Sequence, residues 1–315
     1  MPQNGGAYRG RIFTLTETGF LFVQTEMSNQ IVSSFHPGDV SFLDRGSDTS
    51  VLVHLHGATV LSWRCKGQEV LFVSDNAVFD NKKAIRGGIP IVFPNFGTWK
   101  HGPQHGFARI KRWRVEVPPT KDHKGNVIAA FSLEDDAETR SMWNFKFKLV
   151  YTLELQESSL VQNLCVHNLD KSSFDFTCLL HTYFRTPDVE KMRIMGLQNL
   201  TYCDKLKDSA EFKEDRSEIQ VCENIDRVYT SSPSEIRVTH VGDGSCDAVL
   251  KIFDFPDVVA WNPWVEKSQA MSDFGDDEYH VMLCVEAGCV SKRVVLPPGQ
   301  SFESSQTLIL INSPR

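Results

Sequence analysis

One segment of the sequence, between Arg86 and Arg109, carries residue types suited to holding a small anion. It begins Arg86-Gly-Gly-Ile-Pro-Ile-Val-Phe-Pro and ends Gln104-His105-Gly-Phe-Ala-Arg109. Glycine and proline favour tight turns over regular elements, so we expect a shaped loop. Arg86 and Arg109 present planar, permanently charged donors that suit a phosphate or a carboxylate. The segment therefore predicts a local anion site, with Gln104 and His105 in the same loop.

A histidine lies inside the β-prone run 174–184. Near neutral pH an imidazole can donate or accept a proton, so His181 is a candidate general acid. A lone histidine in a strand is more often a core residue that is hydrogen-bonded to backbone. The residues alone leave both interpretations open.

Two carboxylates are candidates of unequal strength. Glu286 follows the apolar run 281–285 and precedes Ala287-Gly288. Because glutamate is seldom buried without a partner, this position indicates either a cleft that raises its pKa, as a general base needs, or a solvated strand end. Asp226, beside Arg227, is typical of a surface turn or ion pair. Trp261-Asn-Pro-Trp264 supplies aromatic rings that suit either a sugar face or a core.

The elements that must position these side chains are predicted to be strands. Apolar and polar residues alternate with a period of two along 145–156, 127–133 and 51–55. Glycine, proline and asparagine turns separate most of these runs, a pattern typical of a sandwich or barrel. Helical periodicity is limited to 75–83 and 264–274. No shift in composition divides the chain into domains. Further strands are expected at 160–166, 174–184, 236–241, 248–253, 281–285 and 305–311.

The charge, the apolar runs and the cysteines of the chain indicate which partners and which cellular compartment to expect. The 315 residues carry a net charge of −7, which argues against a nucleic-acid partner. No apolar run approaches the ~20 residues that a membrane helix needs, and no secretory signal is evident. The eight cysteines form no Cys-x-x-Cys pair, so we expect reduced, buried thiols in a cytoplasmic protein.

Taken together, five ordered motifs resemble the hexose-6-phosphate mutarotases, also called glucose-6-phosphate 1-epimerases, of the galactose mutarotase-like superfamily. The resemblance runs from about residue 35 to near the C-terminus. The motifs are Arg86-Gly-Gly-Ile-Pro-Ile-Val-Phe-Pro, Gln104-His-Gly-Phe-Ala-Arg109, His181-Thr-Tyr-Phe-Arg, Trp261-Asn-Pro-Trp-Val-Glu-Lys-Ser and Cys284-Val-Glu-Ala-Gly.

The resemblance implies a fold and a reaction. The fold would be all-β, a large antiparallel β-sandwich of the galactose mutarotase-like type with few short helices. We expect residues 1–35 to be an N-terminal extension and 36–315 a single domain. The reaction would interconvert α and β anomers of a hexose 6-phosphate without a metal or redox cofactor, in a monomer.

The resemblance also assigns roles by position. His181 would act as the acid and Glu286 as the base. The sugar phosphate would contact Arg86, Gln104, His105, Arg109 and Asp226.

Two other functions remain open from the sequence. A non-catalytic sugar-phosphate binding or sensing module would keep the arginines but lack the acid or the base, and this chain has both. An aldose 1-epimerase acting on free hexoses such as galactose would not require two arginines at its pocket.

Overall fold

The structure is a computed structural model that describes residues 11–15, 21–25 and 31–313. Within these residues, antiparallel strands dominate and the only α-helices are the short α1 and α2, which confirms the predicted all-β class. The strands are β1 (Arg11–Leu15), β2 (Leu21–Thr25), β3 (Ile31–Phe35), β4 (Val40–Gly46), β5 (Thr49–His54), β6 (Thr59–Cys65), β7 (Gln68–Glu69), β8 (Ile91–Val92), β9 (Arg114–Lys121), β10 (Val127–Glu134), β11 (Phe147–Leu155), β12 (Ser159–Asn168), β13 (Phe174–Leu180), β14 (Tyr183–Arg185), β15 (Ile194–Met195), β16 (Thr201–Asp204), β17 (Ala210–Lys213), β18 (Glu218–Ile219), β19 (Ile225–Thr230), β20 (Glu235–Val241), β21 (Cys246–Phe253), β22 (Asp257–Asn262), β23 (Met282–Leu296) and β24 (Ser301–Asn312).

One large sheet has nine strands in the order β18-β15-β20-β21-β24-β12-β11-β10-β9. Strand β11 shows why its sequence alternates. Phe147, Leu149, Tyr151, Leu153 and Leu155 are all fully buried, while the residues between them are partly exposed. Side chains of a strand point alternately to opposite faces, so this sheet turns one apolar face to the core. The predicted alternation is confirmed.

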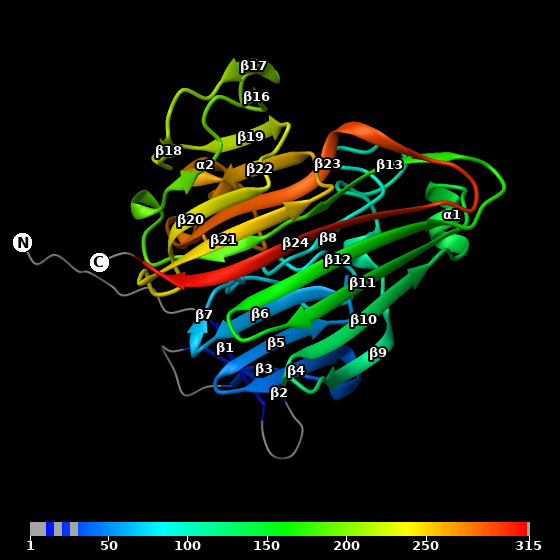
Figure 1. Ribbon diagram of the computed structural model, residues 1–315, viewed down its shortest axis with the longest axis horizontal. Coiled ribbons are helices and arrows are strands. Elements are labelled where there is room, and N and C mark those ends of the chain that lie inside the picture. Colours follow the sequence, from blue (N-terminus) through cyan, green and yellow to red (C-terminus); the bar gives the residue numbers. More distant parts are fainter. Residues whose placement is uncertain (1–10, 16–20, 26–30, 314–315) are drawn as a thin grey trace, which may run out of the picture.

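The second large sheet has the strand order β17-β16-β19-β22-β23-β13-β8, with β14 also paired to β23. One of its faces, which includes Ala260 and Val285, packs into the same hydrophobic core as β11. Figure 1 shows β19, β22 and β23 above the long strands β24, β12 and β11. The two sheets therefore form a sandwich, and the other face of β22 and β23 is free to line a site.

Smaller sheets lie at the N-terminal end of the chain. Strands β4 to β7 form a four-stranded sheet, and β1 to β3 form a three-stranded one. Phe35, the last residue of β3, is buried in a cluster with Leu52, Leu61 and Ile85. Residues 1–10, 16–20 and 26–30 lie outside the described part of the chain, so the division into an extension and a single domain stays a prediction.

The helix predictions were partly wrong. Helix α2 (Trp264–Ala270) occupies the first part of the expected segment. Residues 75–83 form no helix: 75–76 are a turn and 80–83 a bend. In the bend the Asp80 side chain accepts hydrogen bonds from the backbone N–H groups of Lys82 and Lys83 and competes with a helix. Helix α1 (Ala137–Met142) was not predicted, although a capping box at Asp136 starts it.

The prediction of buried cysteines is confirmed only in part. All eight thiols are free. Five are buried, while Cys165 and Cys203 are partly exposed and Cys222 is exposed. No helix in the described segments has the length and apolar character to cross a bilayer.

Candidate active site

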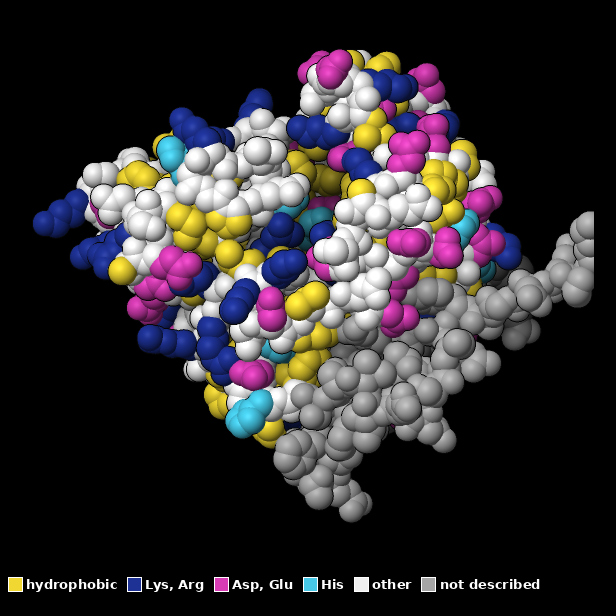
Figure 2. Space-filling model, turned by 180° about the vertical axis from the view of Figure 1, so that it is seen from behind, with side chains coloured by type: hydrophobic (Ala, Val, Ile, Leu, Met, Phe, Trp, Pro, Cys, Tyr) yellow, Lys and Arg dark blue, Asp and Glu magenta, His cyan; other side chains and the backbone are white. Residues whose placement is uncertain are grey.

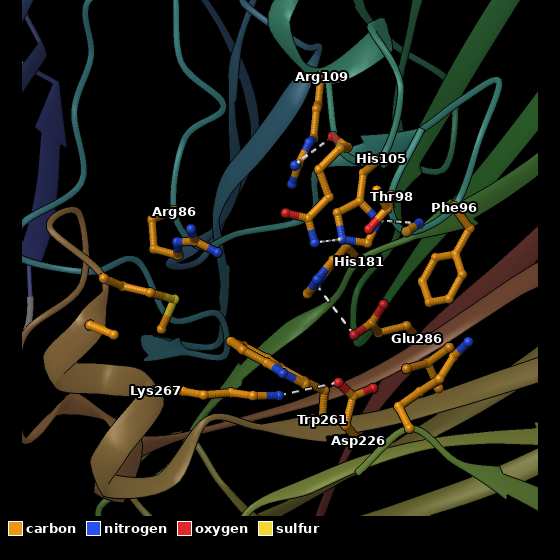
Figure 3. Close-up of a pocket in the computed structure, with 16 residues that line it drawn as sticks. Arg86, Phe96, Thr98, His105, Arg109, His181, Asp226, Trp261, Lys267 and Glu286 are labelled. Atoms are coloured by element: carbon orange, nitrogen blue, oxygen red, sulfur yellow. Dashed lines mark hydrogen bonds and ion pairs between the residues drawn. The ribbon is translucent and has the colours of Figure 1, made fainter. Parts of the chain in front are cut away.

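A cavity of about 730 Å³ opens on the free face of the eight-stranded sheet. Figure 2 shows a hollow near the middle of the face seen from behind, where basic and histidine side chains gather. All seven residues predicted for the site line this cavity (Figure 3): Arg86, Gln104, His105, Arg109, His181, Asp226 and Glu286. The structure therefore brings together side chains that lie up to 200 positions apart in the chain.

Cross-strand pairing explains how the cavity floor forms. Asp226 on β19 is paired with Trp261 on β22, and Val259 on β22 is paired with Glu286 on β23. Directly paired residues share a face of the sheet. Glu286 is an interior residue of β23 and only 1% exposed, so the alternative of a solvated strand end was wrong.

His181 owes its position to a break in the predicted strand. Strand β13 ends at Leu180 and β14 begins at Tyr183, so the histidine belongs to neither. Its backbone N–H donates to the carbonyl oxygen of Pro90, 3.0 Å away. The imidazole stacks on the Tyr183 ring with centroids 4.7 Å apart and meets Trp261 edge-on at 5.9 Å. These contacts fix the orientation of the ring.

His181 and Glu286 form the centre of the site. The Nδ1 atom of His181 lies 3.4 Å from Oε1 of Glu286 (Figure 3). Neither Nδ1 of His181 nor Oε2 of Glu286, both buried, has a hydrogen-bond partner. Buried polar atoms are normally satisfied, so these two are candidates for contacts with a ligand.

Burial changes the acidity of both groups. It lowers the pKa of His181 well below 6.5, and the electrostatic effects of protonated His105 and of the Arg109 and Arg86 guanidinium groups lower it further. Burial raises the pKa of Glu286 well above 4.5. The nearby Asp226 carboxylate raises this pKa further, whereas Arg109 lowers it. Burial therefore disfavours the charged form of both groups, which favours a neutral imidazole and a protonated carboxyl group.

The loop that carries Gln104 and His105 is closed by hydrogen bonds to Gly97. The backbone N–H of His105 donates to the Gly97 carbonyl at 2.9 Å, and Nδ1 of His105 accepts from the Gly97 N–H at 3.2 Å. Burial and the two nearby arginines lower the pKa of His105 to about 3. His105 is therefore a neutral hydrogen-bonding group at physiological pH.

Gly106 is required for this loop, and we expect Gly106→Ala to be strongly destabilising. Its φ is +74°, and an added Cβ would lie 2.1 Å from the Phe93 carbonyl oxygen. Gly125 has a similar φ of +79° with nothing within 4 Å of such a Cβ. Gly125→Ala should cost about 1 kcal/mol of unfolding free energy, from φ alone. Gly106→Ala should cost at least ~2 kcal/mol more in urea denaturation; equal losses would show that the close approach is unimportant.

Two arginines form the cationic wall of the cavity. Nη2 of Arg86 donates to both carboxylate oxygens of Asp273 at 3.2 Å, and Nη1 lies 3.4 Å from the Tyr183 hydroxyl. Nη2 of Arg109 donates to the Gln104 carbonyl oxygen at 2.9 Å. Among the described residues Arg109 has no ion pair with a carboxylate, and its Nε is buried without a partner. Burial lowers the pKa of Arg109 to about 10, which leaves it charged at neutral pH.

Two lysines without a predicted role, Lys205 and Lys267, also line the cavity. Lys205 follows β16 in a turn, and Lys267 belongs to α2. Nζ of Lys267 lies 3.4 Å from Oδ2 of Asp226, so the ion-pair interpretation of Asp226 is correct. Lys267 occurs within the motif that begins at Trp261, whereas nothing local marked Lys205. Trp264 does not line this cavity.

Comparison with known proteins places the chain in a family. The profile of the family described as aldose 1-epimerase matches residues 40–308. The chain belongs to the aldose 1-epimerase family. A protein from Cenchrus ciliaris, named as a candidate glucose-6-phosphate 1-epimerase, is 37% identical over 271 residues, which cover 83% of this chain and 81% of that protein. An Escherichia coli protein with the same name is 32% identical over 244 residues, covering 76% of this chain and 79% of that one.

Solved structures agree with this assignment of an aldose 1-epimerase fold. A candidate mutarotase from Salmonella typhimurium has a TM-score of 0.80 at 26% identity and covers 97% of both chains. The galactose 1-epimerase of Lactobacillus acidophilus has a TM-score of 0.62 at 14% identity, covering 98% of this chain and all of that one. The predicted galactose mutarotase-like sandwich is confirmed, and the protein is an isomerase of the mutarotase type.

Proposed function

We propose that this aldose 1-epimerase interconverts the α and β anomers of hexose 6-phosphates, with glucose 6-phosphate as the principal substrate. The observation that carries the proposal is a buried His181–Glu286 pair in the same cavity as Arg86 and Arg109. A phosphate accepts strong charge-assisted hydrogen bonds from arginine. The names of the Cenchrus and Escherichia coli relatives support the same substrate class.

In the proposed reaction the sugar loses one proton and gains another when its ring opens. Glu286 accepts the proton of the C1 hydroxyl, His181 donates a proton to the ring oxygen, and the C1–O5 bond breaks to give the aldehyde. Rotation about C1–C2 presents the other face of the carbonyl. The ring oxygen then attacks C1 and returns its proton to His181, while Glu286 returns its proton to O1. The reaction is redox-neutral and balances without a cofactor.

Substrate binding prepares the pair for these roles. In the empty cavity the proton favours Glu286, and Arg86 and Arg109 are among the causes that lower the pKa of His181. A bound phosphate, with nearly two negative charges, offsets both arginines. The pKa of His181 then rises, and the C1 hydroxyl offers Glu286 a hydrogen bond that favours the carboxylate. The phosphate is thus proposed to contribute to catalysis as well as to binding.

The pH dependence should be bell-shaped, and its basic limb should respond to Asp226. The active pair holds one proton, so activity falls when His181 gains a second proton at low pH and when Glu286 loses the remaining one at high pH. Asp226 helps to raise the pKa of Glu286. Asp226→Asn should therefore shift the basic limb of kcat/KM to lower pH. The exposed Asp44→Asn should leave the limb in place, and an unmoved limb in Asp226→Asn would contradict the coupling.

Nuclear magnetic resonance exchange spectroscopy tests the function directly. Glucose 6-phosphate and galactose should be compared side by side, each against its spontaneous anomer exchange. The proposal predicts strong acceleration for glucose 6-phosphate and little for galactose. Acceleration of galactose alone would favour an epimerase of free hexoses. Binding of glucose 6-phosphate without acceleration would favour a sugar-phosphate sensor.

We further propose that the enzyme acts as a cytoplasmic monomer with no nucleic-acid partner. Eight free cysteines suit a reducing compartment. A net charge of −7 disfavours binding to a nucleic acid, which is itself negative, so we expect positive charge to act only at local sites such as this cavity.

A further inference from the structure

A third ligand-bearing side chain lies beside the proposed acid–base pair. Cys284 precedes Glu286 by two positions on β23, so both side chains point to the same face of the sheet. His181, Cys284 and Glu286 each offer one nitrogen, sulfur or oxygen atom, and these three atoms lie within 4.8 Å of one another. We propose that this cluster binds a borderline divalent cation such as Zn²⁺, and that the bound ion inhibits anomer exchange.

The distances suit zinc with little rearrangement. Nδ1 of His181 and Oε1 of Glu286 are 3.4 Å apart. On a tetrahedral zinc ion with nitrogen and oxygen bonds of about 2.0–2.1 Å, two such ligands lie roughly 3.3 Å apart. The sulfur bond is longer, about 2.3 Å, which places the sulfur roughly 3.6 Å from each of the other two ligand atoms. Because the three atoms now lie within 4.8 Å of one another, the thiol has to approach by about 1.2 Å at most. Three protein ligands leave a fourth position open to the cavity.

Unsatisfied atoms provide independent support. Nδ1 of His181 and Oε2 of Glu286 are both buried and make no hydrogen bond. The two side chains are only 9% and 1% exposed. A cation held between Nδ1 of His181 and Oε1 of Glu286 would give the unpartnered nitrogen a partner and would lie beside Oε2. The Cys284 thiol is fully buried among Phe72, Tyr183 and Met282, which shields a sulfur–metal bond from solvent.

Ligand type and charge define which cation fits. A thiolate with an imidazole favours zinc, cobalt and similar ions over Mg²⁺ and Ca²⁺, which prefer oxygen. One thiolate and one carboxylate neutralise the double charge of the ion. The nearby guanidinium groups of Arg86 and Arg109 repel a cation, so binding should be reversible. Since the ion occupies the atoms that move the protons, bound metal and catalysis exclude each other.

Cobalt binding tests the site without any assay of activity. Titration of the wild-type protein with Co²⁺ should produce the near-ultraviolet charge-transfer band of a thiolate–cobalt bond, and Zn²⁺ should abolish it. Cys222→Ser, which removes the exposed thiol, should keep the band. Cys284→Ser should lose it, and Cys284→Ala provides a second variant if serine disturbs the fold. No band in the wild type, or a band that survives in folded Cys284 variants, would overturn the proposal.

Inhibition is the second measurement, and this part depends on the proposed function. Buffered Zn²⁺ should suppress glucose 6-phosphate anomer exchange, while Mg²⁺ should not. Cys284→Ser, compared with its own zinc-free rate, should need at least tenfold more Zn²⁺ for half-inhibition than the wild type, because loss of even an outer partner of a metal ligand costs ~10–100-fold in affinity. An unchanged Zn²⁺ requirement would refute inhibition through this site. A protein with the cobalt band but no mutarotation would retain the metal site and lose the proposed function.

Discussion

Glu286→Gln should reduce the accelerated anomer exchange of glucose 6-phosphate by about 10²- to 10⁴-fold, the usual contribution of one positioned proton transfer. The amide has nearly the shape of the carboxyl group but cannot accept the C1 hydroxyl proton. Because Glu286 is buried within β23 and its pKa is raised, a neutral amide should be tolerated by the fold. Exchange spectroscopy gives the rate, and circular dichroism checks the fold.

The exposed Glu235 provides the matched control for this substitution. It lies at the start of β20 and does not line the cavity, so Glu235→Gln should retain the wild-type rate. His181→Ala should cause a loss of similar size to Glu286→Gln. Because the two groups act together in the same ring-opening step, the double variant should have an exchange rate only slightly lower than that of either single variant. Full rates in both single variants would refute the acid–base assignment.

Arg86→Ala should weaken the binding of glucose 6-phosphate by about 10- to 150-fold, corresponding to the ~1.5–3 kcal/mol of a charged hydrogen bond. An unphosphorylated hexose has no C6 phosphate, so its weaker binding should change much less. KM values or calorimetric affinities for glucose 6-phosphate and glucose provide the comparison. Equal losses for the two sugars would remove Arg86 from the phosphate site.

Two further variants separate the causes of this effect. Loss of Arg86 frees the carboxylate of Asp273, which then repels a phosphate. Arg86→Ala combined with Asp273→Asn removes that repulsion and leaves only the missing guanidinium. Arg112 is 53% exposed, pairs with Asp39 and lies outside the cavity lining, so Arg112→Ala is the matched control and should leave both affinities unchanged.

Local patterns in the sequence were sufficient for much of the fold. The alternation along β11 predicted which of its side chains are buried, because every second residue is apolar in a strand that packs one face against the core. The sequence did not predict the sheet order. Pairings such as Asp226 with Trp261 join positions 35 apart, and no local pattern encodes them.

The sequence motifs named seven residues that the structure gathers in one cavity, but they did not identify residues that only the fold brings there. His181 and Glu286 were found, but their local environments were not. The β-prone run around His181 hid the break after Leu180, which depends on tertiary contacts such as the hydrogen bond from Val285 N–H to the Thr182 carbonyl. Lys205 lies in a turn whose residues carry no functional signal, and only the three-dimensional arrangement places it at the cavity.

A crystal structure of the Glu286→Gln variant with glucose 6-phosphate would test the central claim most directly. The account predicts that the C1 hydroxyl lies within hydrogen-bond distance of residue 286, that the ring oxygen faces His181, and that the phosphate contacts Arg86 or Arg109. A sugar bound with its anomeric carbon away from both His181 and residue 286, or a phosphate on neither arginine, would contradict it.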